Sequence, residues 1–373
     1  MEPLTHFLTG ACIGRSGFNR KTAYATLAGV LAAEAADLDI LWGFAGPVEG
    51  LKHHRGITHS FIGAPVVAGV VVGAVWLLYR WRERLSLRKA NASIQAGKSP
   101  PPPGQPVRWW WLYLTALIAA LSHILLDWTN NYGVRPFLPF SGRWYAGNIV
   151  FIVEPVLWAL FFVALVLPWL FGLADREIGA RRKPFRGRGW AIFALAGMAT
   201  LWCWRWAEHA HARALLDNLQ ITSEPVKRVA LEPYPIDPFR WHAILETADF
   251  YQTAEINTWT GSVDSDPQRD VLYIPTVTPA VEAARQTFLG HVYLDWGTWA
   301  VVRDVGQESA PGMKPPQLPP GRHWTTIEFT DLRFAYRFLG TERFEGRPPL
   351  AGWVYIVDDH IVAGEAMDGR QQR

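Results

Sequence analysis

The sequence predicts a polytopic α-helical membrane domain, residues 1–210, followed by a smaller, strand-rich α+β soluble domain, residues 211–373. Two observations predict this fold class. Long apolar runs fill the first part of the 373-residue chain, whose composition is 50% hydrophobic with 20 Trp. After about residue 215 the pattern changes to short stretches of alternating aromatic and β-branched residues, which is typical of strands.

Four apolar runs in the first part are long enough to cross a bilayer, which takes about 20 helical residues. A further run, alanine- and leucine-rich and shorter, lies before these four at 22–36, and we expect it to form the first full crossing of the membrane. The apolar segment 3–13 is too short to cross and is expected to dip in from one side. The four runs are Phe61–Leu78, Trp109–Trp128, Ile149–Leu173 and Trp190–Trp206.

Basic residues predict how the chain is oriented in the membrane, because Lys and Arg are enriched in cytoplasmic loops. The two strongly basic loops are 82–108, which contains the extended Pro-rich stretch 100–103, and 174–189. We therefore expect both loops in the cytoplasm. Alternation then places loops 46–58 and 129–148, together with the whole C-terminal domain, on the extracytoplasmic side.

The soluble domain is predicted to consist mostly of strands. One helix is expected at Thr278–Leu289, because Thr278 can cap its first turn and Pro279 suits the first helical position. Residues 309–322 are rich in Pro and should form a loop, and residues 358–360 should form a hairpin turn. The expected strands are Trp241–Thr247, Phe250–Thr258, Val271–Ile274, Thr298–Val302, Trp324–Phe329, Phe334–Phe338 and Trp353–Val357.

Charge and cysteine content argue against several classes of protein. The net charge of +3 is explained by basic loops flanking membrane helices, so we expect a lipid bilayer and no nucleic acid as partner. The two cysteines, Cys12 and Cys203, lie in apolar segments, which disfavours a disulfide framework or a thiolate metal site. No secretory signal peptide is expected, because the first apolar run carries His6 and lacks a small-residue cleavage site.

The segment His-His-Arg-Gly-Ile-Thr-His-Ser, residues 53–60, contains three histidines, an arginine and two hydroxyl side chains between two long apolar runs. Histidine is the commonest protein metal ligand, and the planar fork of Arg55 suits phosphate or carboxylate. Gly56 permits a tight turn that can aim several side chains at one point. The plain alternative is a polar loop between two hydrophobic helices.

Ionisable residues from five segments fall near one membrane face under the topology above. Charged groups inside membrane segments are costly and are usually functional or paired. We therefore expect a shared, water-accessible site at the outer leaflet. Its members are His6; Asp37 and Asp39; His53, His54 and His59; His123 and Asp127; and Glu154.

Local spacing favours a metal ion. His123 and Asp127 are four residues apart, which places them on one helix face about 6 Å apart, a spacing suited to a zinc- or manganese-like ion. The alternative is a helix-capping aspartate beside an interfacial histidine. Asp37 and Asp39 would point to opposite sides of a continuous helix, so both can serve one site only if the helix ends near Asp37. Glu34 could instead pair with Asp37.

Divalent ions held by mixed His and carboxylate ligands suit hydrolysis. We expect Zn²⁺ first and Mn²⁺ second, with metal ligands His6, Asp39, His59, His123 and Asp127. Asp37 or Glu34 could act as general base, and Arg55 could bind an anionic substrate oxygen or else a lipid headgroup. The catalytic candidates are Asp37, His54, Arg55 and Glu154.

Four blocks occur in a specific order: Thr5-His6, Asp37-Leu38-Asp39, the segment 53–60, and His123-x3-Asp127 followed by Asn131-Tyr132-Gly133. Over about residues 1–170 they resemble a bacterial family of membrane-bound, metal-dependent hydrolases of the inner-membrane, LexA-binding-related type. The turn at 238–241 and the following strands resemble the C-terminal extension of longer members. A more distant similarity is to zinc-dependent phospholipase C enzymes. The resemblance implies a helical domain in the bacterial inner membrane with metal-binding histidines and aspartates, and a hydrolase.

The leading hypothesis is therefore a membrane hydrolase acting on a phosphoester or on a lipid-linked, amphiphilic substrate. The main alternative is a non-enzymatic membrane protein with a structural metal site, whose C-terminal domain binds a partner through its strand edges. A transporter with ion-carrying acids is a third hypothesis. It is disfavoured because the polar residues lie near one face and the chain lacks paired halves.

Overall fold

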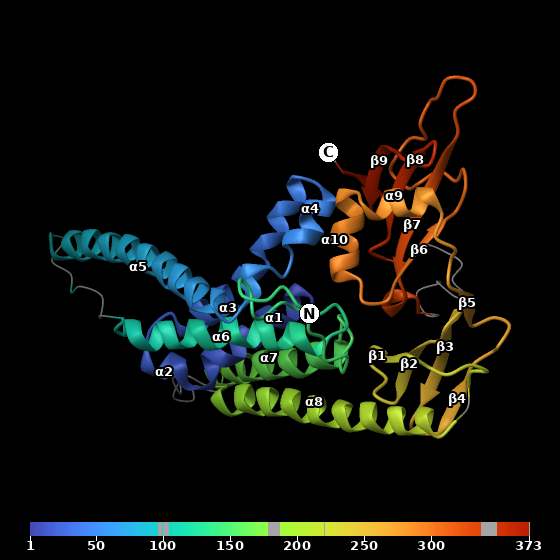
Figure 1. Ribbon diagram of the computed structural model, residues 1–373. Coiled ribbons are helices and arrows are strands. Elements are labelled where there is room, and N and C mark those ends of the chain that lie inside the picture. The colour runs from blue at the N-terminus through green and yellow to red at the C-terminus, as the bar shows by residue number, and fades with distance from the viewer. Residues whose placement is uncertain (96–98, 100–103, 178–186, 220, 337–348, 373) are drawn as a thin grey trace. The chain divides into compact units, whose positions relative to one another are not determined.

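The computed structural model describes residues 1–95, 99, 104–177, 187–219, 221–336 and 349–372 (Figure 1). Its contacts divide the chain into two compact units. The first unit comprises Met1–Leu38 and Arg55–Trp204, and the second comprises Asp39–His54 and Arg205–Arg373. The first unit is helical and the second contains two antiparallel sheets, which confirms the predicted fold class. Segment 39–54 belongs to the strand-rich unit, which the sequence did not indicate.

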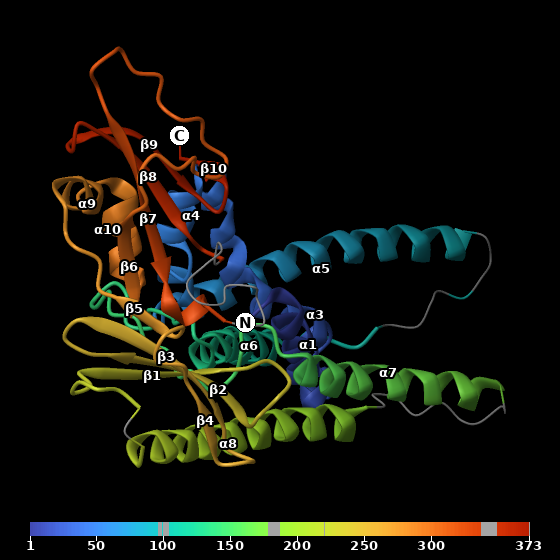
Figure 2. The same cartoon turned by 90° about the vertical axis from the view of Figure 1, so that its right-hand side faces the viewer.

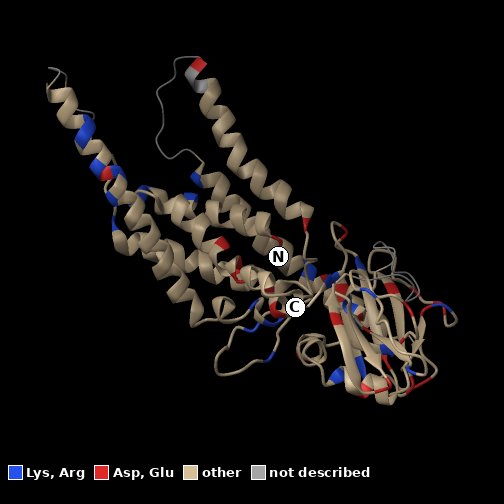
Figure 3. Cartoon of the chain, turned by 90° about the horizontal axis from the view of Figure 1, so that it is seen from above, with Lys and Arg blue, Asp and Glu red and all other residues tan. Residues whose placement is uncertain are grey.

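The first unit is built from helices that Figure 3 shows mostly in tan, with basic residues along the second half of α5. Three helices among the described residues, α5, α6 and α7, are long and apolar enough to cross a membrane. The helices are α1 (Pro3–Ile13), α2 (Asn19–Lys21), α3 (Ala25–Glu34), α5 (Gly63–Gln95), α6 (Trp109–Thr129), α7 (Pro155–Glu177) and α8 (Arg188–Asp217), with a π-helical turn η1 (Gly14–Phe18) and 3-10 segments η2 (Ala35–Phe44) and η3 (Ile57–His59).

Several element ends differ from the expected ones. The segment 82–108 is not loop throughout, because α5 continues through its good helix formers to Gln95. The expected run 149–173 becomes helical only at Pro155, which suits a first helical position. The run 22–36 gives an α-helix of 10 residues before 3-10 geometry begins. Most of the expected loop 174–189 lies outside the described residues.

Small residues let α1, α3 and α6 approach closely. Ala28, Ala32 and Ala33 of α3 lie in one buried cluster with alanines of α5 and α6. At the α1–α3 crossing, a Cβ added to Gly29 would lie 2.5 Å from the backbone oxygen of Gly10. Such contacts are typical of helix packing in membranes, where tight van der Waals fit replaces the hydrophobic effect. This crossing brings the helix that carries His6 against the helix that leads to Asp37.

The second unit contains two antiparallel sheets, which Figure 2 shows from the side. In one sheet the strand order is β1-β2-β3-β4, with β5 also pairing with β3; in the other it is β10-β9-β8-β7-β6. The strands are β1 (Arg228–Pro233), β2 (Arg240–Glu246), β3 (Phe250–Asn257), β4 (Ser262–Asp264), β5 (Val271–Tyr273), β6 (Ala300–Asp304), β7 (Trp324–Asp331), β8 (Gly352–Val357), β9 (Ile361–Met367) and β10 (Arg370–Gln371).

Each sheet packs against helices on one face. The end of α8 contributes Ala212 and Leu216 to a core that also contains Trp241 of β2 and Ile256 of β3. The other sheet packs against α9 (Pro279–Arg285) and α10 (Phe288–Trp296). The alternating burial along β3 follows from this one-sided packing, as expected for a half-buried strand.

Two local predictions in this unit need correction. The single helix expected at 278–289 is two helices, because Thr287 starts α10 by accepting a hydrogen bond from the Gly290 N–H; Thr278 does cap α9 as expected. The strand expected at 334–338 is wrong at its start, since Phe334 ends the 3-10 turn η4 (Leu332–Phe334). Residues 337 and 338 lie outside the described residues. The turn at 358–360 is confirmed between β8 and β9.

Segment 39–54 contains a helix, α4 (Pro47–His53), within the stretch expected to be an outer loop. This helix packs against α10 and β9 of the second unit. The side chain of Gln372 accepts a hydrogen bond from the Val48 N–H at 2.9 Å, and the Lys52 ammonium lies 5.1 Å from the centre of the Phe288 ring. These contacts explain why the segment belongs to the strand-rich unit.

The glycine crossing gives a test of the first unit. Gly29→Ala should lower the free energy of unfolding by about 1–3 kcal/mol, because its Cβ would collide with the backbone of α1. The measurement is the thermal unfolding midpoint of the full chain in detergent. The matched control is Gly73→Ala on α5, where nothing lies within 4 Å of the added Cβ. Equal midpoints for the two variants would contradict the crossing.

Candidate metal centre

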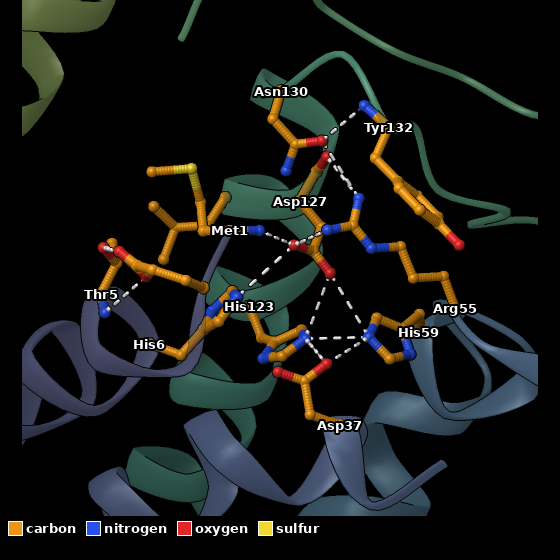
Figure 4. Close-up of polar contacts among 12 residues, drawn as sticks. Met1, Thr5, His6, Asp37, Arg55, His59, His123, Asp127, Asn130 and Tyr132 are labelled. Atoms are coloured by element: carbon orange, nitrogen blue, oxygen red, sulfur yellow. Dashed lines mark hydrogen bonds and ion pairs between the residues drawn. The ribbon is translucent and has the colours of Figure 1, made fainter. Parts of the chain in front are cut away.

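Four ionisable side chains of the first unit converge on one point: Asp37, His59, His123 and Asp127 (Figure 4). They come from η2, η3 and α6, and one ligand atom from each lies within 4.8 Å of the others. The Nε2 atoms of the two histidines are 2.9 Å apart. His59 Nε2 is 3.3 Å from a carboxylate oxygen of each aspartate, and His123 Nε2 is 3.5 Å from Asp37 and 3.2 Å from Asp127.

These distances have the size of a metal coordination shell. A tetrahedral zinc-like ion with bonds of about 2.0–2.1 Å to nitrogen and oxygen separates neighbouring ligand atoms by about 3.3 Å. The distance between the two Nε2 atoms and the four distances from them to the carboxylate oxygens lie between 2.9 and 3.5 Å. Two imidazole nitrogens and two carboxylate oxygens are also a donor set that divalent transition metals accept. The residues present therefore fit a divalent ion.

The backbone and a neighbouring hydroxyl orient both histidines. His123 Nδ1 lies 2.5 Å from the backbone oxygen of Ala33 at the end of α3, and His59 Nδ1 lies 3.1 Å from the hydroxyl of Thr58. A carbonyl oxygen can only accept, so His123 carries its proton on Nδ1 and leaves the lone pair of Nε2 facing the cluster. Fixing the second ring nitrogen in this way is how proteins orient metal-binding histidines.

The two oxygens of Asp127 have separate partners. Oδ2 faces His59 and His123, whereas Oδ1 forms an ion pair with Arg55 at 2.8 Å. The Met1 amino group contacts Oδ1 as well. The carboxylate and the guanidinium are both buried, with side-chain exposures of 1% and 4%. A buried charge requires such a partner, so the ion pair with Arg55 offsets the cost of burying the Asp127 carboxylate.

Arg55 is itself held at several points. It adopts φ of 52°, in the left-handed region, at the turn that separates α4 from η3. Its NH1 group donates to the side-chain oxygen of Asn130 at 3.1 Å and to the backbone oxygen of Gly133 at 2.7 Å, and its guanidinium lies 4.5 Å from the centre of the Tyr132 ring. The sequence predicted that Arg55 could bind a substrate oxygen or a lipid headgroup. In the structure its guanidinium instead contacts Asp127 and the turn after α6.

His6, on α1, lies next to this cluster and contacts two of its members. Its ring stacks on His123 with centroids 3.7 Å apart, and its Nε2 lies 3.4 Å from Asp127 Oδ1. His6 is completely buried. The structure therefore brings His6 to the site on the Oδ1 side of Asp127, whereas the four converging ligand atoms lie on the Oδ2 side.

The other predicted site residues have different surroundings. Asp39 and His54 belong to the second unit, where their carboxylate oxygen and Nδ1 are 2.9 Å apart. Glu154 is buried just before α7, and its carboxylate accepts a hydrogen bond from the Val156 N–H at 3.3 Å, as a helix-capping residue does. Glu34 ends α3. Sequence reasoning missed the Ala33 carbonyl, because residue type does not identify a backbone oxygen as a partner of His123.

The cluster is closed on most sides. The side chains of His59, His123 and Asp127 are 0–1% exposed, whereas that of Asp37 is 19% exposed. Of the four side chains, Asp37 is therefore the one that solvent contacts.

Comparison with known proteins agrees with the helical unit. The model of the family described as YdjM inner membrane protein matches residues 1–212, a stretch that contains all four clustered side chains. The protein YfhP of Bacillus subtilis (strain 168), described as uncharacterized, is 25% identical over 181 residues, which is 46% of this chain. The match covers 47% of that relative, so the chain spans about half of its length. No solved structure matches the chain.

The family match covers more than half of the chain, and the three apolar helices that could cross a membrane lie inside it. The strand-rich part after residue 212 lies outside the match. The chain therefore belongs to the YdjM inner membrane protein family.

Proposed function

We propose that this membrane protein is a metal-dependent hydrolase that acts on a phosphoester or lipid-linked substrate at the membrane surface. The observation that carries the proposal is the N₂O₂ cluster of Asp37, His59, His123 and Asp127, whose dimensions suit a divalent ion. Zn²⁺ is the first choice because two imidazoles and a tetrahedral arrangement suit it, and Mn²⁺ is the second. Location beside apolar helices favours an amphiphilic substrate.

A bound divalent ion would supply Lewis acidity, acidifying a water molecule and polarising a substrate oxygen. The chain's own residues supply the rest. His59, His123 and Asp127 form a buried, pre-oriented set of ligands. Arg55 keeps Asp127 ionised and directs its Oδ2 toward the histidines. Asp37, the most exposed of the four at 19%, would accept a proton from water that enters the site.

One observation favours the alternative, a structural metal site. Structural zinc sites are closed by four protein ligands, whereas catalytic sites keep three and an open position. The cluster offers four, and three of them are buried. The role of Asp37 separates the two functions, because a hydrolase needs Asp37 as base or as a displaceable ligand.

The orientation derived from the basic loops belongs to this proposal. With the basic second half of α5 in the cytoplasm, the chain would be a multi-pass protein whose C-terminal domain lies outside the cytoplasm. The substrate would then be met at the outer leaflet of the bacterial inner membrane.

The metal site is tested first by metal content. The purified full chain should bind a divalent ion, and His59→Ala or His123→Ala should weaken binding by more than about 100-fold, since losing outer partners alone costs about 10–100-fold. The measurement is elemental analysis with chelator competition. His211→Ala, at a side chain 52% exposed in the second unit, is the control and should keep the metal. A wild-type protein without bound ion would refute the proposal.

Asp37→Asn then distinguishes hydrolysis from a structural role. If Asp37 is the base, the variant should keep the metal and lose at least about 100-fold in turnover of phosphoester substrates, the usual size of a general-base contribution. The measurement combines metal content with a phosphodiester and phosphomonoester screen on wild type and variant. Loss of both metal and thermal stability, with an inactive wild type, would favour the structural site.

The orientation is tested by labelling single cysteines in intact cells. Cys203 is exposed and is first replaced by Ser, whereas the buried Cys12 stays. An impermeant maleimide should label Gln268→Cys from outside and Ser99→Cys only after the membrane is opened; both positions are exposed. Labelling of both from the same side would overturn the topology.

A further inference from the structure

The end of the helical unit that lies away from the metal centre carries a group of cations. The metal ligand Asp127 lies near the end of α6, about 27 Å along the helix from Trp109, where α6 begins. At this starting end the ring of Trp109 contacts the ring of Tyr79 on α5, with centroids 5.7 Å apart. The apolar part of α5 ends at Tyr79, and its basic half follows. Both helices are candidate membrane spans, so this end of the unit belongs at a membrane surface.

The segment 21–24, between α2 and α3, is bonded to the residues that lead into α6. The Thr22 hydroxyl accepts a hydrogen bond from the Arg108 N–H at 2.8 Å. The Ala23 N–H donates to the backbone oxygen of Pro106 at 3.2 Å. Arg108, the residue before α6, is therefore held beside the segment 21–24.

Two further cations lie over aromatic rings at the same segment. The Lys21 ammonium lies 5.5 Å from the centre of the Trp111 ring, and the Arg82 guanidinium of α5 lies 5.9 Å from the centre of the Tyr24 ring. Tyr24 has φ of 63°, in the left-handed region, so the turn before α3 holds this ring in place at a cost in backbone strain. Because four consecutive residues extend over at most about 10 Å, Lys21, Arg82 and Arg108 gather around one short stretch of chain.

The charge of these three cations is not balanced by acidic side chains. All three residues are exposed, and among the residues that the structure describes no carboxylate forms an ion pair with any of them. The neighbouring Glu83 is engaged elsewhere, because it accepts a hydrogen bond from the Tyr79 hydroxyl at 3.0 Å and lies 3.5 Å from the Arg80 guanidinium. The group therefore offers three positive charges to an anion from outside the chain.

We propose that Lys21, Arg82 and Arg108 bind the phosphate of an anionic phospholipid. Arginine and lysine are the residues that bind phosphate in proteins, and basic pockets between membrane helices bind anionic headgroups. The rings of Tyr24 and Trp111 suit the same depth, since Tyr and Trp are enriched at the membrane–water interface. A lipid is the occupant because the cations lie at the ends of two apolar helices, where headgroup phosphates are found. The site is independent of the metal centre and of which side of the membrane this end faces.

The test measures phospholipid binding to the full chain in neutral detergent by native mass spectrometry. The wild type should bind phosphatidylglycerol more tightly than the zwitterionic phosphatidylcholine. The triple variant Lys21→Gln, Arg82→Gln, Arg108→Gln should bind phosphatidylglycerol roughly 100-fold more weakly, since each cation near an anionic lipid contributes about fivefold. The single variant Lys21→Gln should lose about fivefold, which keeps the proposal testable if the triple variant does not fold.

The matched control removes three other exposed cations, with Lys227→Gln, Lys314→Gln and Arg370→Gln, and should keep the affinity of the wild type. Equal weakening in the two triple variants would overturn the proposal, and so would equal binding of the two phospholipids by the wild type. Inorganic phosphate that displaces phosphatidylglycerol at equal concentration would also overturn it, because the site would then recognise a free anion. An unfolding midpoint of each lipid-free variant that matches the wild type verifies folding.

Discussion

The buried carboxylate of Asp127 is the constraint on which the first unit depends. A carboxylate removed from water is tolerated only with opposite charge and hydrogen bonds around it. Arg55 neutralises one oxygen at 2.8 Å, and the two histidines face the other. Arg55 is then fixed by the turn after α6. The ion pair and hydrogen bonds of Arg55 therefore both assemble the candidate site and hold these segments together.

Part of this arrangement could be predicted from the sequence. Helical spacing alone places His123 and Asp127 on one face, and the structure puts their facing atoms 3.2 Å apart. The segment 53–60 was expected to deliver several polar groups, and it delivers Arg55 and His59. The long apolar helices and the alternating strands followed from periodicity. In each of these cases the pattern that allows the prediction lies among residues that are close in sequence.

The rest depends on contacts between distant segments. No pattern distinguishes Asp37 from Asp39, because the choice rests on where α3 gives way to 3-10 geometry. The Ala33 carbonyl orients His123 from 90 residues away, and a backbone oxygen leaves no trace in a sequence. Likewise α8 was expected to end at Trp206, yet it continues to Asp217 because the β1–β3 sheet supplies an apolar surface for Ala212 and Leu216.

Chain connectivity links the metal-binding residues to the strand-rich unit. The chain leaves the first unit between Leu38 and Asp39 and returns between His54 and Arg55. Asp37 and Arg55 therefore lie next to the two junctions. The intervening segment is held within the second unit by α10, β9 and Gln372. Asp37 and Arg55 are thus separated by a segment that folds with the strand-rich unit, an arrangement that neither spacing nor periodicity in the sequence indicates.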